Sequence, residues 1–209
     1  MNIQRQKLIL NYWFPGIDEE TVLSADSPCV KKWFARDPRT DKEISDQFKQ
    51  DVLYAATGAY NSWRDTIEGT LALVIVLNQF PRHIYRNKAD IFDYDLKALE
   101  CCFKALKLKL DQKLPLYERQ FLYMPLIHSE NAEIQEMSLM YFQRLQHRAQ
   151  EEEDINLDYY NRLSQFAQQQ YDIIKRFRRY PHRNEVLKRR PTSEERAFTQ
   201  QPEPSFLNL

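Results

Sequence analysis

Apolar residues recur along most of this chain at intervals of three and four, the spacing that places them on one face of an α-helix. Between the periodic stretches stand residues that cap or stop helices. The pattern predicts helices over these segments: Ile3–Phe14, Ser27–Phe34, Thr40–Gly58, Thr66–Phe80, Asp90–Leu110, Pro115–Met124, Asn131–Leu145, Asn156–Tyr180 and a short helix from Thr192. We therefore expect an all-α fold of antiparallel helical pairs or a compact helical bundle.

Several helix ends follow from local chemistry. Thr40 with Glu43, and Thr192 with Glu195, have the spacing of a capping box, in which the hydroxyl caps the helix and the glutamate reaches back. Proline lacks a backbone N–H and disfavours helical geometry in the residue before it, so we expect Pro81 and Pro125 to end helices. Ser129 and Asn131 are alternative caps for the helix that follows them, and Asn156 is the expected cap of the next.

One stretch differs from the amphipathic remainder. Leu71–Leu77 is apolar all round, so it should be buried on every side. No second strand-like segment is present to pair with it, which favours a helix over a strand. In Asp90–Leu110 we expect an inward stripe with lysines opposite, made by Leu96, Leu99, Phe103, Leu106 and Leu110.

The length of 209 residues suits a single all-helical domain over residues 1–200, followed by a tail at residues 201–209. The longest apolar run is far shorter than the roughly 20 residues that a membrane-spanning helix needs. The N-terminus also lacks the succession of basic, apolar and small residues that marks a signal peptide. We expect a cytoplasmic protein that does not bind a membrane.

Composition excludes several function classes. The net charge is zero, so the chain as a whole has no attraction for nucleic acid. Three glycines are too few and too scattered for a phosphate-binding loop or a dinucleotide fingerprint. The three cysteines, Cys29, Cys101 and Cys102, match no zinc pattern and are expected to be buried, reduced thiols. We therefore expect no metal and no cofactor.

A polar string follows the apolar helix directly. Arg82 and Arg86 stand one helical turn apart beside Pro81, and together they can bind a carboxylate or phosphate group. The alternative is that they tie the end of the helix to acidic side chains of the protein itself. A second string holds His128 and Glu130, which can share a proton or stand at a helix N-terminus, where Glu130 meets the helix dipole.

The densest basic segment runs from Lys175 to Arg190 and contains His182 and Arg183. Interleaved aromatic and basic residues are typical of nucleic-acid binding, but cations near a helix C-terminus also complement its dipole. A structural role is favoured here, followed by binding of an anionic small ligand and then by nucleic-acid binding. The run Glu151–Asp154 is expected to be a solvated loop.

These strings resemble the bacterial domain-of-unknown-function family numbered 924. The matching stretches are Asn11–Phe14, Leu71–Arg82, Phe121–Glu130, Arg176–Asn184 and Thr192–Glu195. Their order and spacing extend across nearly the whole chain. The resemblance implies a tetratricopeptide-like helical fold and implies no established reaction.

The chain departs from the pattern of that family at four positions. Asn78 stands where an aspartate is usual, and His83 where an asparagine is usual. Arg178 and Lys188 replace glycines. The missing carboxylate at position 78 argues against a metal ligand or general base there, and the two added cations make this copy more basic.

Two functions compete on this evidence. The favoured one is a binding module that holds a peptide, a protein or a small anionic ligand in a groove. The other is an enzyme acting on an anionic metabolite, with histidine and glutamate as acid and base and arginines as an anion clamp. A weaker alternative is an RNA-associated protein. The candidate ligand-binding residues are Arg82, Arg86, His128, Glu130, His182 and Arg183. All of them except Arg86 are expected to approach one another in the fold.

Overall fold

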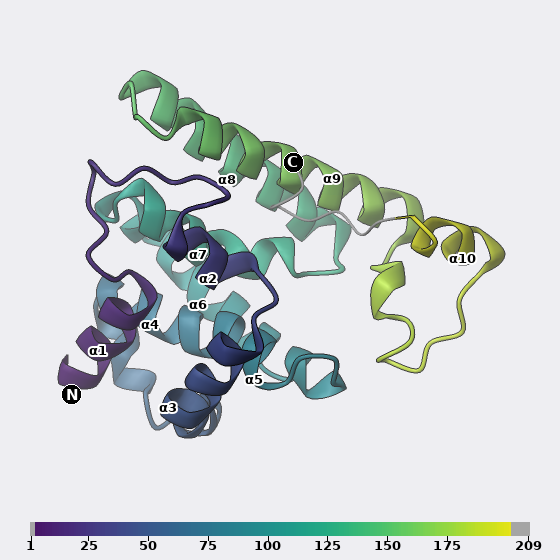
Figure 1. The fold of residues 1–209 in the computed structure, drawn as a ribbon, viewed down its shortest axis with the longest axis horizontal. Helices are drawn as coiled ribbons and strands as arrows, with labels where there is room; N and C mark the ends of the chain where they lie inside the picture. The colour runs from purple at the N-terminus through teal and green to yellow at the C-terminus, as the bar shows by residue number, and fades with distance from the viewer. Residues whose placement is uncertain (1–2, 202–209) are drawn as a thin grey trace. The chain divides into compact units, whose positions relative to one another are not determined.

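A computed structural model describes residues 3–201, and the predicted C-terminal tail at residues 201–209 lies almost wholly outside that range. Within residues 3–201 the chain is helical and contains no β-strand, which confirms the all-α prediction. The α-helices are α1 (Ile3–Trp13), α2 (Pro28–Phe34), α3 (Pro38–Ala56), α4 (Ile67–Val74), α5 (Phe80–Ile84), α6 (Asp95–Lys107), α7 (Leu116–Ile127), α8 (Ala132–Glu151), α9 (Leu157–Phe177) and α10 (Ser193–Thr199) (Figure 1). None of these helices is long and apolar enough to span a bilayer.

Contacts divide the chain into two compact units. The first comprises residues 3–86 and 90–125, and the second comprises residues 87–89 and 126–201. Helices α1 to α6 and most of α7 belong to the first unit, and α8 to α10 belong to the second. The expected single domain over residues 1–200 stays a prediction, because such a grouping does not test whether either unit folds alone.

The core of the first unit forms around the apolar run. Every side chain of Leu71–Leu77 is at most 2% exposed, as the sequence predicted. Thr66 caps α4 by accepting a hydrogen bond from the backbone N–H of Gly69. Aromatic rings close the core from other helices: Trp13 lies edge-on to Phe80 at 5.7 Å and to Phe121 at 5.5 Å between ring centroids.

The helix does not end at Pro81, and that prediction is wrong. After α4 the chain widens into a π-helical turn, Ile75–Gln79, and continues as α5. The N–H of Phe80 donates to the carbonyl of Ile75, five residues back. In a regular α-helix a proline ring collides with the carbonyl group four residues earlier. The wider turn makes room for the ring. The polar residues after Pro81 are therefore held on a helix rather than on a loop.

Three other local predictions are also wrong. Helix α7 includes Pro125, because the buried apolar residues around it hold the segment helical despite the proline. Helix α3 begins at Pro38 and is capped by Asp37, which accepts from the N–H of Arg39, so Thr40 is not the cap. Leu96 is 75% exposed at the start of α6, because the buried face of that helix is made by other residues.

The second unit is built on a long helical hairpin. Helices α8 and α9 lie side by side, and the short turn between them makes them antiparallel (Figure 1). Asn131 caps α8, as predicted, by accepting from the N–H of Ile134. Beyond α9 a segment with a short 3-10 turn, Pro181–Arg183, leads to α10, whose capping box from Thr192 to Glu195 is present as predicted. The tetratricopeptide-like arrangement itself stays a prediction.

The three cysteines are free and buried, as expected from the sequence. Burial raises the pKa of the Cys101 thiol, so at neutral pH it is not a thiolate. Cys29 and Cys102 show the same direction of shift for the same reason. These side chains therefore contribute to packing rather than to nucleophilic chemistry.

Two cations of the second unit adopt a backbone conformation that favours glycine. Arg178 has φ 59° at the C-cap of α9, and Lys188 has φ 53°. A left-handed conformation costs a residue with a Cβ about 1 kcal/mol relative to glycine. Both are positions at which the sequence comparison above expects glycine.

This geometry predicts a difference between two variants at one position. Arg178→Gly and Arg178→Ala remove the same charge, so the helix-dipole contribution cancels between them. We expect the glycine variant to be more stable than the alanine variant by about 1 kcal/mol, since only alanine retains a Cβ in the left-handed region. Urea denaturation of the two variants measures the difference, and equal stability would contradict the observed backbone conformation.

Candidate functional site

In the first unit, Arg82 is held by an acid of the protein itself. Its two terminal nitrogens donate to Asp95 over 2.9 and 3.0 Å, and one of them also donates to the carbonyl of Asn78. The amide of Asn78 donates to the same carboxylate over 3.0 Å, and Gln79 donates to Asn78. Arg82 therefore fastens α5 to the start of α6.

Arg86 is held in the same way by a second acid. It donates to both oxygens of Asp41 over 2.6 Å, and Nδ1 of His83 lies 2.9 Å from one of these oxygens. His83 is 5% exposed, and burial lowers its pKa to about 4 even though Asp41 acts in the opposite direction. At neutral pH this imidazole is therefore uncharged. The two arginines thus bind different carboxylates, Asp95 and Asp41, rather than one shared anion.

In the second unit, three of the candidate residues gather around Tyr180. The carboxylate of Glu130 accepts the backbone N–H of Tyr180 over 2.8 Å. The guanidinium of Arg183 stacks on the tyrosine ring at 4.3 Å, and the His182 ring lies 5.2 Å from it, centroid to centroid. His128 is half-buried directly after α7. Glu130, His182 and Arg183 are thus brought together as the sequence suggested, whereas Arg82 and Arg86 belong to the other unit.

Tyr180 is itself a buried anchor, 1% exposed. Its hydroxyl donates to the carbonyl of Ile127 over 2.5 Å and accepts from the amide of Gln135 over 2.8 Å. Its ring packs with Ile173 and Ile174 of α9. The segment after α9 is thereby fixed to the corner between α7 and α8.

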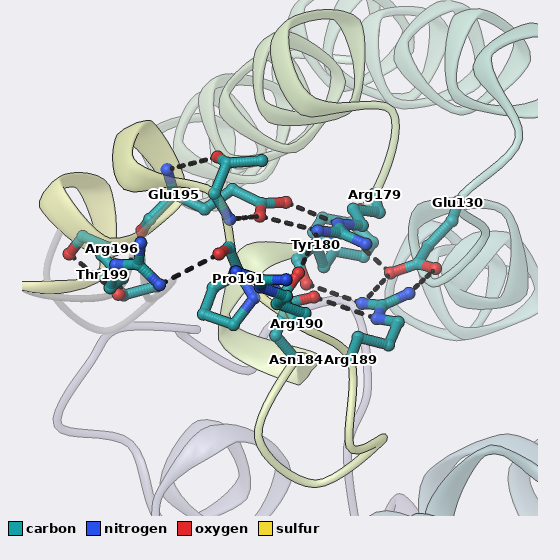
Figure 2. Close-up of polar contacts among 11 residues, drawn as sticks. Glu130, Arg179, Tyr180, Asn184, Arg189, Arg190, Pro191, Glu195, Arg196 and Thr199 are labelled. Atoms are coloured by element: carbon teal, nitrogen blue, oxygen red, sulfur yellow. Dashed lines mark hydrogen bonds and ion pairs between the residues drawn. The ribbon is translucent and has the colours of Figure 1, made fainter.

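Glu130 does more than meet a helix dipole. Besides the Tyr180 N–H, it accepts two hydrogen bonds from Arg189 over 2.7 and 3.0 Å (Figure 2). Arg189 also donates to the side chain of Asn184 and to the carbonyl of Tyr180. Burial alone would raise the pKa of Glu130, but these hydrogen bonds hold it below its usual value. The carboxylate is therefore charged at neutral pH and positions Arg189.

A second arginine–glutamate fork closes the same segment. Arg179 donates to both oxygens of Glu195 over 2.5 and 2.7 Å, and to the carbonyl of Arg190. Glu195 also accepts from the N–H of Thr192 as part of the capping box. Hydrogen bonds from Arg179 and Thr192 lower the pKa of Glu195 to about 2. The two forks, Glu130–Arg189 and Arg179–Glu195, define the path of the chain from α9 to α10 (Figure 2).

Removing the first fork should loosen this segment. We expect Glu130→Ala to lower the free energy of unfolding by about 2–4 kcal/mol, because it leaves Arg189 and the buried N–H of Tyr180 without their acceptor. Glu136→Ala is the matched control, since Glu136 is an exposed residue within α8. Chemical denaturation of both variants measures the effect. A Glu130→Ala variant as stable as the control would show that the Glu130–Arg189 fork does not contribute to the free energy of unfolding.

The segment between the two forks and α10 borders a cavity of about 530 Å³ that is open to solvent on one side. Its lining includes the polar side chains His182, Asn184, Glu185, Arg189 and Arg196. Pro181, Pro191 and Phe198 supply apolar surface. This volume lies within the roughly 300–1,000 Å³ range of small-molecule sites.

Two charged residues of the lining were not singled out from the sequence. Arg196 lies in α10, whose sequence predicts only a capped helix near the C-terminus. Glu185 lies in a turn whose sequence has no apolar periodicity. Arg189 was visible as part of the basic run, but its partner Glu130 is 59 residues away. No spacing rule connects residues so distant, so the sequence pointed to the segment and not to its pairing.

Within residues 3–201, no three histidine, cysteine, aspartate or glutamate side chains cluster in a way that would hold a metal ion. The charged groups described in the second unit include the two arginine–glutamate forks and the side chains that line the cavity.

Comparison with known proteins agrees with the fold. A solved structure of a protein of unknown function, ATU0120 from Agrobacterium tumefaciens, matches with a TM-score of 0.79 at 26% sequence identity. The match covers 97% of this chain and 100% of that one. No functionally curated protein matches the chain. The family model described as "Bacterial protein of unknown function (DUF924)" matches residues 9–203, so the chain belongs to that family.

Proposed function

We propose that this protein binds a small anionic ligand in the cavity of its second unit. The observation that carries the proposal is the lining, in which Arg196 borders about 530 Å³ of space together with His182 and Arg189. A cationic group in a concave site of this size is suited to a carboxylate or phosphate.

The charge distribution supports the same proposal. Residues 175–199 contain nine lysines and arginines and three glutamates, although the whole chain has equal numbers of basic and acidic residues. An excess of positive charge beside a concave site raises the local concentration of anions. The cavity thus lies in the most basic part of the sequence.

Arg196 is the arginine best placed to contact a ligand. Arg176, Arg179 and Arg189 are each paired with a glutamate, at 2.7, 2.5 and 2.7 Å. The exposed side chain of Arg196 donates instead to the carbonyl of Pro191, over 3.1 Å, and forms no ion pair among the described residues. Its charge therefore remains available for an anion.

A small ligand fits better than an extended peptide or a protein. All described lining residues come from the span 181–201, so one short segment of chain surrounds the space. A groove for an extended peptide needs a longer surface made by several helices. Nucleic acid is also disfavoured, because Tyr180 is buried and Phe177 packs on Phe198 at 5.0 Å, which leaves these rings unsuited to base stacking.

Thermal denaturation with a panel of phosphate, sulfate and carboxylate compounds tests the proposal. A ligand at about 100 times its Kd should stabilise the protein by about 2.7 kcal/mol. We expect Arg196→Ala to abolish the stabilisation and Arg190→Ala to preserve it, because Arg190 carries the same charge in the same segment without lining the cavity. Equal losses in both variants would indicate general electrostatic attraction, and no stabilisation by any compound would refute the proposal.

A further inference from the structure

The three acidic residues of the basic segment 175–199 differ in their surroundings. Glu194 pairs with Arg176 and Glu195 pairs with Arg179. Glu185 lines the cavity and forms no ion pair among the described residues, even though it is surrounded in sequence by cations. Glu185 is therefore the acidic residue of this segment whose charge remains available to a partner from outside the protein.

Glu185 and Arg196 line the same cavity without pairing with each other. Each is exposed, and each lacks an oppositely charged partner within ion-pair distance among residues 3–201. The cavity therefore presents one negative and one positive group at separate places on its wall. An acidic group on a ligand would complement Arg196, and an amine on the same ligand would complement Glu185.

The lining of the cavity also includes apolar surface. Pro181 and Pro191 carry no side-chain hydrogen-bonding groups, and the ring of Phe198 is half-buried against Phe177. Apolar surface of this kind accepts the hydrocarbon part of a ligand, while a few polar groups fix its orientation.

We infer that the ligand is a zwitterion of the amino-acid type, whose acidic group contacts Arg196 and whose protonated amine contacts Glu185. This inference rests on the proposed anion-binding function and adds the requirement for an amine. The acidic group is a carboxylate or a phosphate, since both match a guanidinium. The hydrocarbon part lies against Phe198 and the two prolines.

The experiment compares three chemical forms of each probe by isothermal titration calorimetry. The probes are the twenty amino acids and phosphoethanolamine, each with its amine-free acid and its acid-free amine, for example phenylalanine, 3-phenylpropionate and phenethylamine. We expect at least one zwitterion to bind at least tenfold more tightly than either of its two truncated forms. Phosphoethanolamine against the amino acids distinguishes a phosphate from a carboxylate as the acidic group.

Two variants separate the inference from the function on which it rests. Glu185→Gln should weaken binding of the zwitterion to the level of its amine-free acid and leave the affinity of that acid equal or higher. Arg196→Ala should weaken the binding of both the zwitterion and its amine-free acid. Glu136→Gln, which removes an exposed glutamate outside the lining, should change neither.

The possible outcomes are distinct. If amine-free acids bind as tightly as their zwitterions, or if Glu185→Gln does not reduce the preference for the zwitterion, the inference fails while anion binding stands. If none of the acids or zwitterions binds, the proposed function fails and the inference fails with it. A tenfold preference that is lost in Glu185→Gln supports both.

Discussion

Replacing Val74 with aspartate is expected to unfold the first unit or to bring it close to unfolding. Val74 is fully buried at the end of α4, within the apolar run whose side chains are at most 2% exposed. An uncompensated charge in such a place costs about 3–5 kcal/mol, which is comparable to the whole stability of many domains. Far-ultraviolet circular dichroism during urea denaturation would measure the loss.

Leu96→Asp is the matched control for this experiment. It makes the same kind of substitution in the same unit, but at a side chain that is 75% exposed. Surface substitutions usually change stability by no more than about 0.5 kcal/mol. If Val74→Asp melted within a few degrees of Leu96→Asp, the apolar run would not be the core of this unit.

A histidine that is neutral when folded should make the first unit sensitive to mild acid. The folded pKa of His83 is about 4, and its ordinary value is 6.5, so between these pH values the unfolded chain binds a proton that the folded chain excludes. The free energy of unfolding is therefore not reduced by His83 above about pH 6.5, and it falls as the pH decreases toward 4. At about 1.4 kcal/mol per pKa unit, the total loss approaches about 3 kcal/mol.

His83→Asn should remove this pH dependence. Asparagine does not titrate, and its amide can donate to Asp41 as the imidazole does. The charged neighbours Asp41, Arg82 and Arg86 remain, so any acid sensitivity that they cause persists in the variant. Urea denaturation at pH 7.5, 5.5 and 4.5 should show a smaller decline in the variant than in the parent. Parallel declines would mean that His83 is protonated in the folded protein.

The helical architecture could be read from the sequence because it depends on local chemistry. The periodic apolar stripes predicted most helices, and the capping box from Thr192 to Glu195 is present as predicted. Asn131 is the cap of α8, one of the two alternatives that the sequence offered. Burial of Leu71–Leu77 followed from the absence of any polar face. Each of these inferences uses residues within about one helical turn or one helix of each other.

The errors arose where tertiary packing outweighs a local preference. Pro81 and Pro125 both lie inside continuous helices, because surrounding apolar contacts offset the loss of a backbone hydrogen bond. At Pro81 a π-helical turn also makes room for the proline ring. The helical periodicity predicted around Leu96 is correct, but the buried face at the start of α6 is rotated by a fraction of a turn from the predicted face. Propensity alone cannot reveal such compensation.

The candidate site was predicted only in part, for a related reason. The sequence identified Glu130, His182 and Arg183, and the structure places all three around Tyr180. It did not identify which arginine pairs with Glu130, because that depends on how the chain returns after α9. The cavity residues Arg196 and Glu185 were not part of any motif recognised in the sequence. What distinguishes them is that neither forms an ion pair among the described residues, which only the structure shows.

The hydrogen bond from the Tyr180 N–H to Glu130 provides a reporter for the motion of the second unit. An amide proton held by a half-buried carboxylate exchanges with solvent deuterium mainly when that contact opens. The Tyr180 amide has no partner in a regular helix that would protect it independently. Its exchange rate therefore measures how often the segment around the cavity detaches from the helical hairpin, and a ligand that fills the cavity would slow that exchange without contacting the amide.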